Sequence, residues 1–68
     1  MDLVIEIQES LIPIEIKQSE TARAEMAKEI MAFQRDFEGK AGQGYLIQPG
    51  KVTLPLGKGV TSLPLRNL

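Results

Sequence analysis

The chain has 68 residues, with eight basic and nine acidic side chains and neither cysteine nor histidine. A chain of this length forms at most one domain, and it buries only about 60% of the surface that its unfolded form exposes. The missing cysteine and histidine exclude disulfides and the common zinc sites. Because such small domains are usually stabilised by disulfides, a metal or oligomerisation, the composition favours a protein that binds another chain.

The charges are divided unevenly along the chain. Residues 1–38 carry all nine carboxylates and four of the cations, which leaves a net charge of −5. Residues 39–68 carry no acid, the other four cations, all six glycines and three of the four prolines. This division predicts an acidic, regularly folded first half and a basic, extended second half.

Two strands are predicted at residues 3–7 and 12–16, where aliphatic residues recur at every second position. We expect the strands to form a hairpin with Ile7 opposite Ile12, joined by a four-residue loop at 8–11. That register places Pro13 at a non-hydrogen-bonded position, and the proline should block pairing at the outer edge of the second strand. It also gathers six aliphatic residues on one face: Leu3, Ile5, Ile7, Ile12, Ile14 and Ile16.

One helix is predicted from Ser19 to Glu38. Ser19 is a good N-cap, and Gly39 is a typical residue to end a helix. An apolar stripe runs along this segment at helical spacing. We expect it to pack on the hairpin, with both phenylalanines as core anchors. The stripe consists of Ala22, Met26, Ile30, Phe33 and Phe37.

The fold class expected from these elements is α+β. Residues 1–38 form a small ββα mini-domain, residues 39–44 a glycine hinge, and residues 45–68 an extended arm or short β-hairpins with Gly/Pro turns. Two outcomes are open for the arm: it folds on its own domain or on another chain. Its apolar residues exceed what one small ββα face needs, so we favour a neighbouring chain.

No chemical motif in the sequence withstands a check of its spacing. A phosphate-binding loop at Gly57-Lys58 fails, because Val52 and Gly59 stand where the motif needs glycine and serine or threonine. Glu25 and Glu29 lie four residues apart on the predicted helix, but beside Lys28 they are typical of a solvated face. We therefore expect no catalytic residue, no metal site, no cofactor and no enzymatic activity.

The function expected is protein–protein interaction or structural assembly. The basic, apolar arm should dock on a neighbouring chain, either a second copy or a larger assembly such as a virus particle. No small-molecule substrate is expected. The residues expected to contact the partner are Tyr45, Lys51, Leu54, Leu56, Lys58, Leu63, Leu65 and Arg66.

Two alternatives are kept beside this reading. A small inhibitor could bind a larger target through the acidic face of the helix, which carries Glu20, Glu25, Glu29, Asp36 and Glu38. Nucleic-acid binding has less support, because the cations of the arm are not clustered. With no signal peptide and no apolar run of about 20 residues, we expect a cytoplasmic protein or a member of a soluble assembly.

Overall fold

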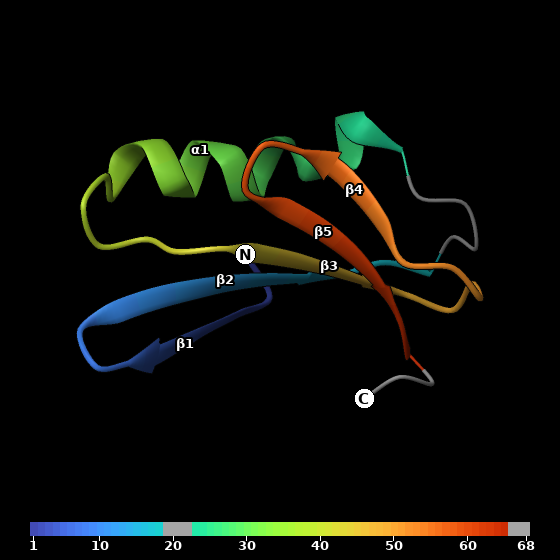
Figure 1. Ribbon diagram of the computed structural model, residues 1–68, viewed down its shortest axis with the longest axis horizontal. Coiled ribbons are helices and arrows are strands. Elements are labelled where there is room, and N and C mark those ends of the chain that lie inside the picture. Colours follow the sequence, from blue (N-terminus) through green and yellow to red (C-terminus); the bar gives the residue numbers. More distant parts are fainter. Residues whose placement is uncertain (19–22, 66–68) are drawn as a thin grey trace.

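The computed structural model describes residues 1–18 and 23–65. These residues form one five-stranded sheet and two consecutive helical segments, in the sheet order β1-β2-β3-β5-β4 (Figure 1). Along the chain the elements are β1 (Leu3–Ile7), β2 (Ser10–Ile16), the 3-10 helix η1 (Ala24–Ala27), α1 (Lys28–Asp36), β3 (Gly44–Gln48), β4 (Leu54–Gly57) and β5 (Val60–Pro64).

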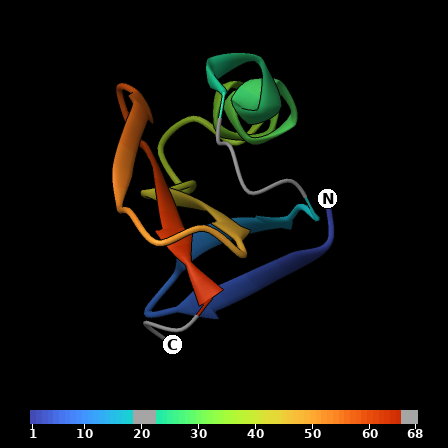
Figure 2. The same cartoon turned by 90° about the vertical axis from the view of Figure 1, so that its right-hand side faces the viewer.

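The sheet is mixed, and both helical segments lie over the same face of it (Figure 2). The pairs β2–β3 and β3–β5 are parallel, whereas β1–β2 and β4–β5 are antiparallel. The expectation of a ββα unit followed by an extended arm was therefore wrong. The segment read as an arm supplies three of the five strands, so the chain provides the apolar surface that we had assigned to a neighbour.

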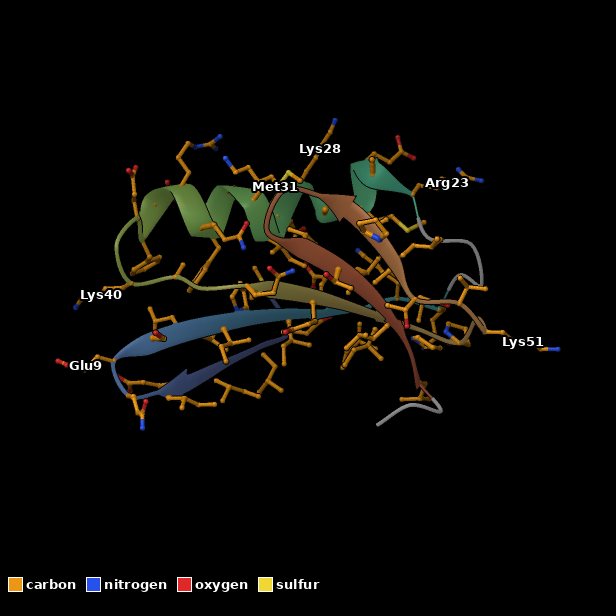
Figure 3. The ribbon with its side chains drawn as sticks, in the orientation of Figure 1. Glu9, Arg23, Lys28, Met31, Lys40 and Lys51 are labelled. Carbon is orange, nitrogen blue, oxygen red and sulfur yellow. The ribbon has the colours of Figure 1, made fainter. Side chains whose placement is uncertain are left out.

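The core lies between the helical segments and the C-terminal strands. Leu46 of β3 and Val60 of β5 are fully buried, as are Ala27 and Ile30 on the helical side, and Leu56 of β4 is 8% exposed. Met26 and Met31 pack around this cluster, and Figure 3 shows Met31 directed toward β4. The three strand residues thus complete a core that β1, β2 and the helix do not fill alone.

The hairpin of β1 and β2 has a shorter loop than expected. Ile7 pairs with Ser10, so only Gln8 and Glu9 form the turn, with φ angles of +49° and +70°. Positive φ at both central residues is the geometry of a type I′ turn, whose twist matches the flanking strands. The predicted four-residue loop was wrong. The observed register differs from the predicted one by two residues, since Ile7 pairs with Ser10 and not with Ile12. An even shift keeps the aliphatic residues on one face.

Pro13 does not blunt the edge of β2, contrary to expectation. It lies opposite Val4 in the hairpin. On its other side β2 pairs with β3 from Ile14 to Ile16, starting one residue after the proline. A missing N–H removes one ladder position only, and the strand continues past it.

The helical region is shorter than the predicted span of 19–38. It begins with η1, and α1 ends at Asp36, three residues before Gly39, whose φ is +92°. Ser19, Glu20 and Ala22 lie outside the described residues. Ile30 is a core residue as expected, but Phe37 is 44% exposed and its ring lies 4.6 Å from that of Phe33. The expectation that both phenylalanines anchor the core was wrong, because aliphatic side chains fill it.

The glycine-rich segment between α1 and β3 is held by hydrogen bonds. Leu11 N donates to Lys40 O and Gly42 N donates to Leu11 O, both at 2.8 Å. The Gln34 amide donates to Gly42 O at 2.9 Å and to Gly59 O at 2.8 Å. The division into residues 1–38, 39–44 and 45–68 stays a prediction about domain organisation. In the structure these segments are joined through one sheet.

Candidate functional site: a carboxylate cluster around Glu15

The residues predicted to contact a partner are distributed over three strands and two turns. Leu56 is buried in the core, Tyr45 and Leu63 are half-buried, and Arg66 lies outside the described residues. Leu54, Leu65, Lys51 and Lys58 are exposed. Figure 3 shows Lys40 and Lys51 at opposite ends of the molecule. Because alternate residues of a strand point to opposite faces, these residues do not share one surface.

The most unusual side chain of the sheet is that of Glu15. It lies in β2 next to Leu46 of β3, on the face that the helix covers, and it is only 3% exposed. Its Oε2 atom has no hydrogen-bond partner among the described residues. A buried polar atom without a partner is destabilising by about 1–3 kcal/mol, so its retention calls for an explanation.

Two other carboxyl groups approach Glu15 from different elements. Asp2 directly precedes β1, and its Oδ2 accepts a hydrogen bond from Ile16 N at 2.8 Å. Glu29 is the second residue of α1, and its Oε2 lies 3.6 Å from the amino group of Met1. Both carboxyl groups lie close enough to Glu15 to raise its pKa. The pairing of β1 with β2 and the packing of α1 on the sheet bring the three together.

The three acids divide their protons unequally. Burial raises the pKa of Glu15 to about 7, and the neighbouring Glu29 and Asp2 add to the effect. The backbone N–H of Ile16 lowers the pKa of Asp2, with a further contribution from Glu15. The pKa of Glu29 is lowered by its hydrogen bond with Glu15 and by the terminal amine. Near pH 7, Glu15 is therefore protonated in about half of the molecules, while Asp2 and Glu29 are charged.

Lys17 is the cation of this region. It lies two residues after Glu15, so both side chains start on the same face of the extended backbone. Lys17 is half-buried, and its positive charge helps to lower the pKa of both Asp2 and Glu29. The end of β2 therefore combines one buried carboxyl, two charged carboxylates and one ammonium group.

A shallow groove of about 100 Å³ lies beside Lys17, between the ends of β2 and β3. Ile47, Pro49 and Leu65 line it together with Lys17. Sites for drug-sized molecules occupy about 300–1,000 Å³. The groove is therefore too small to enclose such a molecule by itself.

A pKa of about 7 lets Glu15 hold a proton near neutral pH. Within residues 1–18 and 23–65, no group of three or more His, Cys, Asp or Glu side chains is placed to hold a metal ion. A proton on one of the carboxyl groups offsets part of the negative charge that a bound cation would otherwise neutralise.

Sequence reasoning missed this cluster. The sequence suggests Glu29 only as a solvated neighbour of Glu25 and as part of an acidic helix face. Glu25 instead pairs with Arg23 at 3.8 Å on the surface. Glu15 alternates with the aliphatic residues of its strand, and that alternation alone does not single it out. The available signal was the Glu15-Ile16-Lys17 pattern, which places two charged residues on the face opposite that apolar set.

The comparisons with known proteins identify a family without assigning a function. No curated protein and no solved structure matches the chain. The family pattern described as a domain of unknown function (DUF4143) matches residues 1–68. The chain therefore belongs to the DUF4143 family.

Proposed function

We propose that the carboxylate cluster binds a hard divalent cation, such as Mg²⁺ or Mn²⁺, and acts with it on a phosphate diester. One observation carries the proposal: Glu15 is buried with an unpartnered oxygen between the carboxyl groups of Asp2 and Glu29. A strongly shifted pKa with identifiable charged neighbours is typical of functional sites.

A hard cation suits the donor set. Carboxylate oxygens are the ligands of Mg²⁺ and Ca²⁺, and Mg²⁺ is commonly held by one or two carboxylates together with substrate phosphates. Binding would release the proton of Glu15 and give its unpartnered Oε2 a partner. The carboxyl groups would have to shift, since their present arrangement is not a complete ligand set.

Lys17 supports a phosphate ligand. A cation bound at the cluster would polarise a phosphoryl oxygen and activate water. Lys17 would then offset the negative charge that develops on the phosphoryl oxygens. In the hydrolysis, water oxygen bonds to phosphorus, the bond to the leaving oxygen breaks, and that oxygen takes a proton. A singly charged diester is repelled less by Asp2 and Glu29 than a doubly charged monoester.

This proposal replaces the expectation of a non-enzymatic protein, which no observation tests. It includes the nucleic-acid alternative, since nucleic-acid backbones are phosphate diesters. The inhibitor alternative is less supported, because Glu29 of its acidic face engages Glu15. In the part of the chain that the structure describes, no helix is long and apolar enough to cross a membrane. A cytoplasmic location stays part of the proposal.

Protein binding stays a second proposal, supported by aliphatic residues at the surface of the sheet. Leu3, Ile7, Ile16 and Leu65 are each 48–58% exposed. Such residues favour contact with another protein when they are contiguous.

Calorimetric titration of the full chain with Mn²⁺ tests cation binding. We expect Glu15→Gln to weaken binding at least tenfold. Glu25→Gln, which removes the same charge from an exposed residue of the same helical region, should leave it unchanged. Repeating the titration near pH 7 in buffers of different ionisation enthalpy should show proton release, which Glu15→Gln should abolish. Equal affinity in both variants, without proton release, would refute the cation site.

Turnover is tested separately, with bis(p-nitrophenyl) phosphate and Mn²⁺. We expect Lys17→Met to lower the rate at least tenfold while Mn²⁺ affinity changes little. The monoester p-nitrophenyl phosphate should be the poorer substrate. Tight Mn²⁺ binding without any diester cleavage would leave the cation site standing and reject the enzymatic part.

A further inference from the structure

The two edges of the sheet differ in how well they are protected. β4 is four residues long, contains Pro55, and has an irregular register between Pro55 and Gly57. Short length, proline and bulges are the devices that blunt an edge. β1 has five residues with regular pairing and neither proline nor lysine, and among the described residues no strand pairs with its outer side (Figure 1).

The hydrogen bonds of β2 show which backbone groups of β1 are free. Leu11 N donates to Lys40 O and Lys17 N to Ile47 O, both away from β1. Ile16 N donates toward Asp2, on the β1 side. Since the direction alternates along a strand, Ser10, Ile12 and Ile14 bond to β1 through their partners Ile7, Ile5 and Leu3.

The N–H and C=O groups of Val4 and Glu6 therefore point away from the sheet. The side chains of this edge are also uncovered, with Leu3, Val4, Ile5 and Ile7 between 38% and 51% exposed. An edge with free backbone groups and exposed aliphatic side chains is a template for another strand.

We propose that β1 pairs with β1 of a second copy, antiparallel, about a two-fold axis at Ile5. In this register Val4 faces Glu6 of the second copy, and these two residues hold the free backbone groups. They form two equivalent hydrogen-bonded pairs, and Ile5 faces itself at a non-hydrogen-bonded position. Leu3 faces Ile7, so the aliphatic faces of the two hairpins become continuous.

The charges of β1 select this register. A shift of two residues in one direction sets Glu6 opposite Glu6, and in the other it sets Glu6 opposite Asp2. Like charges directly opposite each other are destabilising. Only the two-fold at Ile5 sets Glu6 opposite an uncharged residue while matching the free backbone groups. This self-complementarity favours a second copy as the occupant, and a C₂ interface of this kind is closed.

The dimer does not depend on the proposed cation site, and it differs from docking through the C-terminal segment. Disulfide trapping tests the register in a chain that has no cysteine. Residues at a non-hydrogen-bonded position have Cα atoms about 4.5 Å apart, within the range that a disulfide spans. Ile5→Cys should crosslink to a dimer under mild oxidation at least tenfold faster than Ile7→Cys, although Ile7 is the more exposed residue (51% against 38%), because Ile7 faces Leu3.

Charge variants at Val4 test the same register without oxidation, by sedimentation equilibrium at micromolar to millimolar concentration. Val4→Lys places a cation opposite Glu6 and should keep or tighten the dimer. Val4→Glu places two like charges opposite each other and should weaken it at least tenfold. Circular dichroism would confirm that both variants are folded. A monomeric wild type throughout this range, or equal crosslinking of the two cysteine variants, would overturn the proposal.

Discussion

The two antiparallel hairpins at the ends of the sheet differ in what they bury. The hairpin of β4 and β5 directs Leu56 and Val60 into the core beneath the helical segments. The hairpin of β1 and β2 leaves most of its aliphatic residues exposed and instead buries a carboxyl group, Glu15. The difference shows that the C-terminal hairpin contributes aliphatic side chains to the core, while the N-terminal hairpin carries the buried carboxyl group.

Removal of the C-terminal half gives the largest expected effect. A chain that ends at Gly42 lacks β3, β4 and β5, and with them every strand residue of the core cluster. We expect it to be unfolded by far-ultraviolet circular dichroism and to exchange its amides without protection. A folded, protected chain of residues 1–42 would reverse the comparison and restore the independent ββα unit.

Single aliphatic truncations sharpen the same comparison. Leu56→Ala removes a buried core side chain and should lower the free energy of unfolding by about 2–5 kcal/mol. Ile7→Ala in the other hairpin removes a side chain that is 51% exposed, and should change it by about 0.5 kcal/mol or less. Urea denaturation of the monomer measures both. Similar losses of unfolding free energy in the two variants would contradict the difference in burial between the two hairpins.

The pH dependence of stability tests the N-terminal hairpin. Because the pKa of Glu15 is raised to about 7 in the folded state, the folded protein binds more protons than the unfolded chain between about pH 4.5 and 7. The free energy of unfolding should therefore fall as pH rises through this window, by at most about 3 kcal/mol.

Glu15→Gln is the control for this titration and should flatten the curve between pH 4.5 and 7. Asp2 and Glu29 have lowered pKa values, so their contributions run in the opposite sense and are lost at more acidic pH. A metal-free protein whose stability rises across the window would contradict the assignment of the proton to Glu15.

Gln34 links the two regions and should give the smallest of these effects. Its amide donates to Gly42 O, just before β3, and to Gly59 O in the turn between β4 and β5. Gln34→Ala leaves both carbonyls without this donor and should cost about 1–2 kcal/mol. Gln43→Ala, which removes an exposed amide bonded to Thr61 Oγ1 at 2.9 Å, is the control and should cost less than half as much.

The local pattern of the sequence was sufficient for some of these features. Alternation of aliphatic residues predicted both N-terminal strands, and the shared face of Leu3, Ile5, Ile12 and Ile14 follows from a period of two whatever the even register. The spacing of the apolar residues around Ile30 predicted a helix. The expectation that it packs on the aliphatic face of the hairpin was wrong, because the helix covers the face that carries Glu15 and Leu46. The glycine and proline dipeptides marked the limits of the later strands.

Other features required contacts between residues far apart in the chain. The parallel pairs of β3 with β2 and β5 join segments that no turn connects directly, so short-range signals could not distinguish a sheet strand from an arm. Asp2, Glu15 and Glu29 are separated by 13 and 14 residues. Periodicity decided which side chains share a face. Only the packing of α1 on the face of β2 that carries Glu15 removed water from this side chain and gave it two carboxylates as neighbours.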